Sequence, residues 1–169
     1  MTLYTLEEFA THLTRAFASY RPRVVYDTTD KGENTVEFLV PNPHDPRFSI
    51  SLQAKGSQKW VEACTLWFGQ AEFSGRLDPD MAISAIETIL SDEVVAILRY
   101  KNEDAYDDHR LAGNQWLYQL TDDEDDDSEV LEKMKQKLAS PPSFTDKLSG
   151  KMLGVFEIFS WSEAELIRR

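Results

Sequence analysis

Hydrophobic positions near the start of the chain recur at helical spacing. Five apolar or aromatic residues are separated by three or four positions: Leu6, Phe9, Leu13, Phe17 and Tyr20. Thr5 precedes this pattern, and Glu8 stands three residues after Thr5, which is the spacing of a capping box. The pattern predicts an amphipathic helix over about residues 6–19 that ends near Pro22.

The following stretch alternates between apolar and polar residues, as strands with one solvated face do. It predicts four strands, over residues 24–26, 36–40, 48–52 and 60–68. A glycine-containing turn and a group of prolines separate the first three strands. The fourth strand is apolar on both sides, which favours a central position, and its continuation to Phe73 past a kink at Gly69 stays open.

The second half of the chain mixes helical and strand patterns. Asp78-Pro79 predicts the start of a helix that is apolar around much of its girth and ends near Asp92. Strands are then expected over residues 93–101, 115–120 and 151–161, and a polar helix over 129–138. Ser162 is predicted to cap a short C-terminal helix.

These elements favour an α+β fold. Consecutive strands joined by short turns pair antiparallel, and grouped strands flanked by helices differ from the alternating order of a doubly wound sheet. We expect a single domain over residues 1–169, with a largely antiparallel sheet of about five to seven strands and flanking helices. Cys64 is the only cysteine, which excludes a disulfide scaffold.

Charge is concentrated in one segment of the chain. The formal net charge is −12, and residues 103–132 hold twelve acidic residues against one basic residue, Arg110. The rest of the chain is therefore nearly neutral. We expect an acidic loop region at about residues 102–129, which would repel nucleic acid and attract cations or basic proteins.

Two aromatic residues lie between the acidic stretches, as in protein-binding surfaces that combine aromatic anchors with a charged rim. The candidate partner-binding residues are Asp107, Asp108, Trp116, Tyr118, Asp122, Asp123, Glu124, Asp125, Asp126 and Asp127. Two plainer interpretations stay open. The acidic run can be a solvated loop that aids solubility, and Trp116 and Tyr118 can be core residues of a strand.

The sequence contains no recognisable catalytic, phosphate-binding or metal-binding motif, and we expect no cofactor and no metal. The acidic run does not fit a calcium-binding EF-hand, whether the loop starts at Asp122 or at Asp123. Two glutamates on one face of the expected strands could form an acid–base pair, but solvent-facing positions explain them more simply: Glu37, Glu62, Glu72 and Glu157. Asp107-Asp108-His109 is typical of a polar loop, although it can also hold a cation or orient an imidazole.

One resemblance adds to this picture. The stretch Thr65–Phe73, a following helix and the strand Glu93–Tyr100 resemble small bacterial proteins of unassigned function, some of which look like immunity proteins of polymorphic toxin systems. The resemblance covers roughly residues 34–101 and includes no catalytic residue. Histidines often follow the Phe-Gly pair in that group, whereas Glu72 and Phe73 stand there in this chain. The resemblance implies a stoichiometric protein partner rather than a reaction.

Two functional hypotheses follow. The first is a cytoplasmic module that binds a basic protein, such as an immunity-type inhibitor of a basic toxin, with no nucleic-acid or membrane partner. The alternative is an enzyme or ligand-binding domain with a pocket between helix and sheet, for which the candidate groups are Glu62, Glu72, Cys64 and His109. Cys64, however, lies in the most apolar expected strand and is expected to be a buried, inert thiol.

Overall fold

The computed structural model describes residues 3–28, 32–57, 60–73, 75–120 and 126–169. Its contacts group the chain into two compact units, Met1–Leu90 and Ser91–Arg169.

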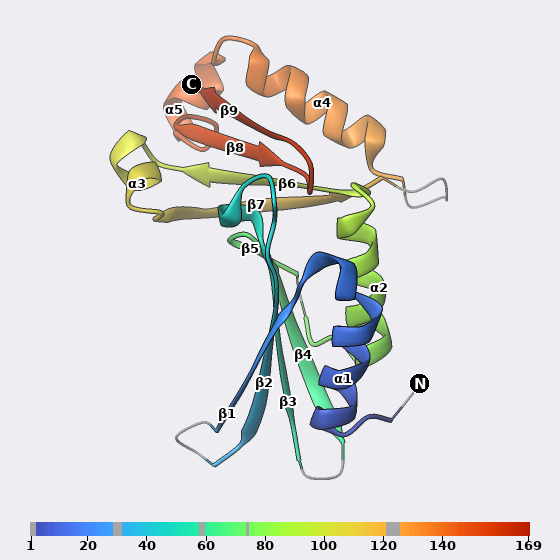
Figure 1. Ribbon diagram of the computed structural model, residues 1–169. Helices are drawn as coiled ribbons and strands as arrows, with labels where there is room; N and C mark the ends of the chain where they lie inside the picture. Colours follow the sequence, from blue (N-terminus) through green and yellow to red (C-terminus); the bar gives the residue numbers. More distant parts are fainter. Residues whose placement is uncertain (1–2, 29–31, 58–59, 74, 121–125) are drawn as a thin grey trace. The chain divides into compact units, whose positions relative to one another are not determined.

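The N-terminal unit contains a five-stranded antiparallel sheet whose strands are ordered as in the chain (Figure 1). The strands are β1 (Arg23–Thr28), β2 (Asn34–Val40), β3 (Ile50–Gly56), β4 (Val61–Phe68) and β5 (Ala71–Glu72). The helices are α1 (Leu6–Ala16), α2 (Pro79–Leu90) and the single-turn 3-10 helices η1 (Ala18–Tyr20) and η2 (Pro46–Phe48). The short connections between consecutive strands account for the antiparallel pairing.

The hydrophobic alternation along these strands separates a buried sheet face from a more exposed one. Phe38, Leu52 and Leu66 form one cross-strand row and are fully buried. Helix α1 packs on this face, where the ring of Phe17 lies 6.2 Å from that of Phe38. The predicted capping box is present, because the Glu8 N–H donates to Thr5 Oγ1 at 3.2 Å and the Thr5 N–H donates to Glu8 Oε2 at 2.9 Å. The start of α1 is therefore determined both by the spacing of its apolar residues and by the capping box of Thr5 and Glu8.

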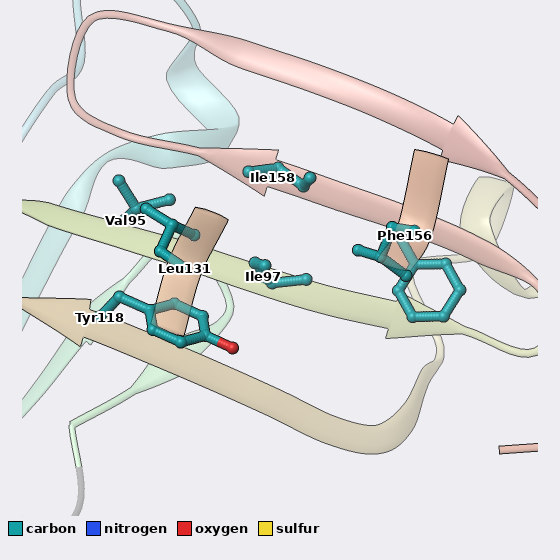
Figure 2. Packing of buried hydrophobic residues seen from close by; sticks show 7 residues of the cluster. Val95, Ile97, Tyr118, Leu131, Phe156 and Ile158 are labelled. Carbon is teal, nitrogen blue, oxygen red and sulfur yellow. The ribbon is translucent and has the colours of Figure 1, made fainter. Parts of the chain in front are cut away.

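The C-terminal unit contains a four-stranded antiparallel sheet in the order β7-β6-β8-β9. Its strands are β6 (Val94–Tyr100), β7 (Leu111–Gln119), β8 (Val155–Phe159) and β9 (Ala164–Arg168), and its helices are α3 (Glu103–Asp107), α4 (Ser128–Ala139) and α5 (Phe144–Ser149). Figure 2 shows the core on one sheet face, where Val95, Ile97, Tyr118, Phe156 and Ile158 pack with α4 residue Leu131.

The α+β class and the antiparallel pairing are confirmed, but two details of the prediction are wrong, and one open point is now resolved. The strands form two sheets rather than one. Residues after Ser162 form β9 rather than a helix, because pairing with β8 overrides the helical preference of Ala164 and Glu165. The fourth strand does not continue to Phe73: Gly69 has φ +58°, and the chain reverses there so that β5 pairs back on β4. A single domain stays a prediction, since two compact units can unfold together.

A buried ion pair connects the end of the chain to α5. Arg169 Nη2 lies 3.3 Å from Asp146 Oδ2, and both side chains are at least nine-tenths buried. The same guanidinium donates to the carbonyl oxygens of Met152 and Ser140. Asp146 also accepts from the N–H of Ser143 at 3.0 Å in the capping box of α5. These contacts hold α5 and the end of β9 together.

Gly154 provides a test of backbone packing in this unit. Its φ is +125°, and a Cβ atom there would collide with the carbonyl oxygens of Tyr100 and Lys101. We expect Gly154→Ala to lower the free energy of unfolding by about 1–3 kcal/mol, measured by urea denaturation. Gly113→Ala is the control, because Gly113 also has a positive φ (+81°) but open space around it. Equal losses in the two variants would contradict the collision.

The carboxyl of Asp146 provides a pH-dependent test. Its hydrogen bond from the Ser143 N–H holds its pKa below the usual 3.8, helped by the charges of Lys137 and Arg169. A folded-state pKa below the unfolded value stabilises the protein above pH 4, and that contribution is lost as the pH falls through the folded pKa. We expect Asp146→Asn to be less stable than the parent at pH 7 and the difference to shrink by pH 3 in urea titrations. Asp107→Asn, at an exposed position, is expected to show no such convergence.

Candidate functional site

Two groups of acidic residues in the C-terminal unit lie at the two ends of strand β7. At its start, the Arg110 N–H donates to the carbonyl of Ala105 at 2.7 Å, which joins β7 to α3. Asn102 caps α3 by accepting from the Ala105 N–H. The carboxylates here are all exposed: Glu103, Asp104, Asp107 and Asp108. Acidic residues near a helix N-terminus are electrostatically favourable, which fits Glu103 and Asp104.

At the other end of β7, Asp127 pairs with the last strand residue. The Gln119 N–H donates to Asp127 Oδ2 at 3.0 Å, and the Asp127 N–H donates to the Gln119 carbonyl at 2.9 Å. Asp126 Oδ1 accepts from the N–H of Ser128, the first residue of α4. The β6 residues that pair with the two ends of β7 are Val94 and Tyr100, six steps apart, so the two acidic groups are about 20 Å apart along the strand. They are two patches rather than one.

Basic side chains partly balance these patches. The ion pairs are Glu103–Arg168, Asp108–Arg110 at 2.8 Å, Glu129–Lys133 at 2.5 Å and Glu132–Lys135 at 3.9 Å. All of them are solvent-exposed to a third or more, so each contributes little to stability and can be exchanged for an intermolecular pair. The unit Ser91–Arg169 has eighteen acidic and ten basic residues, a formal charge of −8, whereas Met1–Leu90 has a formal charge of −4.

The structure corrects the expected role of one aromatic residue and limits that of another. Tyr118 is only 7 % exposed and belongs to the core beneath α4, so its side chain is a packing residue and not a surface anchor. Trp116 is half-buried against the same core. Asp107, Asp108, Asp126 and Asp127 lie at the ends of β7 as described. Asp122, Asp123, Glu124 and Asp125 lie outside the described residues.

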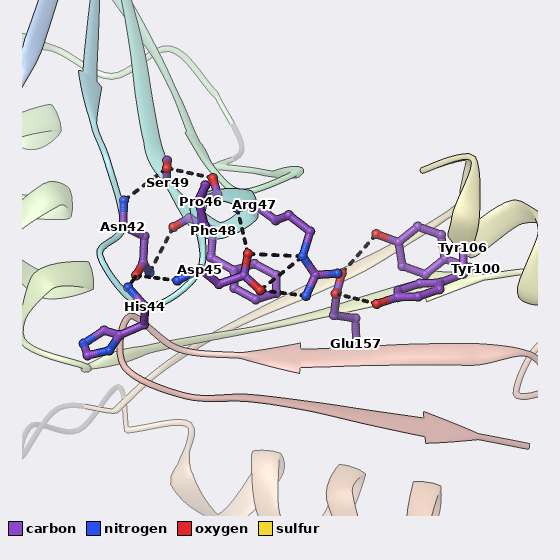
Figure 3. Close-up of polar contacts among 10 residues, drawn as sticks. All are labelled: Asn42, His44, Asp45, Pro46, Arg47, Phe48, Ser49, Tyr100, Tyr106 and Glu157. Atoms are coloured by element: carbon purple, nitrogen blue, oxygen red, sulfur yellow. Dashed lines mark hydrogen bonds and ion pairs between the residues drawn. The ribbon is translucent and has the colours of Figure 1, made fainter.

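The structure buries one carboxylate that the sequence did not predict to be buried, that of Glu157. Glu157, expected to face solvent, is only 4 % exposed. Its Oε2 accepts from the hydroxyl of Tyr100 at 3.1 Å, and its Oε1 lies 3.5 Å from the hydroxyl of Tyr106 (Figure 3). The sequence does carry a signal for this burial, because Glu157 stands between apolar residues. The strand they form is buried on both faces.

Figure 3 also shows a polar connection in the N-terminal unit, between β2 and β3. The buried Asn42 accepts from the N–H groups of His44 and Asp45 at 2.8 and 3.2 Å. Asp45 in turn accepts from the N–H of Arg47 and pairs with its guanidinium at 2.7 Å. These contacts are explained by the shape of the turn, which follows Pro41 and Pro43 and enters η2 at Pro46.

The candidate residues of the enzyme hypothesis do not share a surface within the N-terminal unit. Cys64 is fully buried, whereas Glu62 and Glu72 are exposed. The register between β3 and β4 shifts at Gly56, which pairs with Val61 and leaves Glu62 as an extra, outward residue. His109 belongs to the other unit, where it is exposed at a left-handed turn with φ +55°. The described residues therefore show no convergence of these groups.

Comparison with protein-family models, curated proteins and solved structures finds no match for this chain. Among the described residues, no group of three histidine, cysteine or acidic side chains is arranged to hold a metal ion. No helix in the described part of the chain is long and apolar enough to cross a bilayer. The function proposed below is therefore inferred from the geometry and the charge of this chain alone.

The environment of Cys64 leads to a chemical prediction. Burial raises the pKa of its thiol to about 12, with a smaller contribution from the charge of Asp78. Because the thiolate is the reactive form, we expect the native protein to react with a disulfide reagent at pH 8 more than about a hundredfold more slowly than the urea-unfolded protein. Fast reaction of one thiol per chain in the native state would contradict this and revive a nucleophilic role.

Proposed function

We propose that this protein is a binding module for a basic protein, and that the C-terminal unit provides the contact surface. The observation that carries the proposal is the pair of carboxylate patches at the ends of β7, about 20 Å apart. A small ligand cannot contact both patches. A standard protein interface, at about 800 Å² per partner and about 30 Å across, spans them.

The charge distribution supports a basic partner. Exposed carboxylates accelerate encounter with a cationic surface and lower the affinity for wrong partners of like charge. The existing surface ion pairs are weak in solvent, so arginine or lysine residues of a partner can replace them at small cost. The resemblance to immunity proteins adds a class of partner, namely a toxin with a basic active site that the complex would block.

The alternative, an enzyme or a ligand-binding domain with a pocket between helix and sheet, has less support. Its candidate thiol, Cys64, is in the core, and the two carboxylates beside it in the sequence face solvent. General acid–base or nucleophilic chemistry needs groups within hydrogen-bonding reach of one reacting atom. No observation of the described residues favours this alternative over protein binding.

The test compares two triple variants of equal charge change. Asp104→Asn, Asp107→Asn and Asp126→Asn remove three carboxylates from the patches, whereas Glu37→Gln, Glu62→Gln and Glu87→Gln remove three exposed carboxylates from the N-terminal unit. A basic partner is first isolated from the native host at low and high salt, and its affinity is then measured with purified proteins. We expect the patch variant to lose on the order of tenfold in affinity and to show a smaller salt dependence.

The N-terminal control variant is expected to bind like the parent protein. Equal losses in both variants would show that overall charge, rather than the surface of the C-terminal unit, determines binding. A partner whose affinity is the same for all three proteins at every salt concentration would contradict the proposed acidic contact surface.

A further inference from the structure

A hollow of about 390 Å³ lies within the C-terminal unit, where the start of α4 meets the connection from β8 to β9. Its apolar lining comes from Val95, Leu120 and Leu131. Val95 and Leu131 also belong to the core beneath α4, so this part of the wall is held in place by packing. Pockets of this size with a firm apolar wall and a few polar groups are typical binding sites for small groups.

The charged lining of the hollow is mainly acidic. Asp92, Glu132 and Glu163 contribute carboxylates, and Lys135 is the single basic residue in the lining. These carboxylates come from three separate segments of the chain. Among the described residues they do not form a group that could hold a metal ion. A guanidinium, with five N–H donors in a planar fork, suits several carboxylate acceptors better than a point charge does.

Asp92 is fixed in its ionised form. Its Oδ1 accepts from the Ser162 N–H at 2.8 Å. Although partial burial acts in the opposite direction, hydrogen bonds from Ser162, Ser160 and Trp161 keep the pKa of Asp92 below its usual value. The hollow therefore keeps a negative charge at its wall at neutral pH.

The existing partner of Glu132 is weakly held. Lys135 Nζ lies 3.9 Å from Glu132 Oε1, at the limit of an ion pair, and both side chains are more than a third exposed. An incoming cation can displace this ammonium group at small cost. Lys135 thus acts as an internal competitor for the hollow.

We propose that the hollow receives an arginine side chain of the basic partner. The methylene stem lies on the apolar wall, and the guanidinium donates to the carboxylates of Asp92, Glu132 and Glu163. This inference rests on the proposed function, to which it adds a point of attachment and a residue type. Arginine is one of the residues that most often dominate the energetics of protein interfaces.

The first test uses a defined probe and the full chain. Amide shifts in ¹H–¹⁵N spectra are followed while Nα-acetyl-arginine amide is added, and Nα-acetyl-citrulline amide, which is neutral and similar in shape, is the control ligand. We expect saturable shifts at Leu120, Leu131 and Ser162 with the arginine derivative, and at least about tenfold weaker binding of the citrulline derivative.

Matched variants locate the site. Glu163→Gln is expected to weaken binding of the arginine derivative at least about threefold, whereas Glu165→Gln, an exposed position on β9 outside the hollow, leaves it unchanged. Lys135→Gln is expected to strengthen binding, because it removes the competing ammonium group. Shifts spread over all acidic positions, or equal effects of Glu163→Gln and Glu165→Gln, would overturn the proposal.

The second test separates this inference from the proposed function. With the isolated basic partner, Glu163→Gln is expected to reduce affinity at least about threefold relative to Glu165→Gln. If the patch variant loses affinity but Glu163→Gln does not, the acidic contact surface stands and the arginine site is overturned. If neither variant loses affinity, both proposals fail.

Discussion

The cost of removing carboxylates from water determines where the acidic segment can lie. An ionised carboxylate is buried only with compensating donors or an opposite charge. Strand β7 runs through the middle of this segment and contains no charged residue. The described carboxylates before and after it stay at the surface, around α3 and at the start of α4. The uncharged strand β7 thus separates the acidic residues into two patches, one at each of its ends. The proposed interface follows from that separation.

Glu157 and Asp146 show what burial of a carboxylate requires in this protein. Glu157 is hydrogen-bonded by the hydroxyls of Tyr100 and Tyr106, and Asp146 has both the Ser143 N–H and the guanidinium of Arg169. Glu157 is held by residues more than fifty positions earlier, whereas Asp146 combines a local hydrogen bond from Ser143 with an ion pair to Arg169, twenty-three positions later. The carboxylates at the ends of β7 also have partners, such as Arg110 for Asp108 and Ser128 for Asp126, but these contacts lie at the surface, where each contributes little to stability.

The elements of the fold were largely predictable, but their assembly was not. The helical period and the capping box identified α1, and alternation identified β2, β3 and β4. These signals are local. The end of the chain was misassigned because the strand character of Ala164–Arg168 comes from pairing with β8, which local preference does not contain. Likewise, burial of Glu157 depends on Tyr100, fifty-seven residues earlier.

The candidate site depends even more on contacts between residues that are distant in the sequence. The charge of residues 103–132 is visible in the sequence, and it is the basis on which a basic partner is proposed. The hollow is not visible, because Asp92, Glu132 and Glu163 are separated by forty and thirty-one positions and belong to no common pattern.

The two features also act differently in binding. Exposed patches attract many basic surfaces and mainly raise the association rate, whereas a shaped hollow with an apolar wall retains one side chain and lowers the dissociation rate. A module with patches alone would bind basic proteins with little discrimination. Selectivity for one partner requires a feature that depends on shape as well as charge, and in the C-terminal unit the hollow beside α4 combines the two.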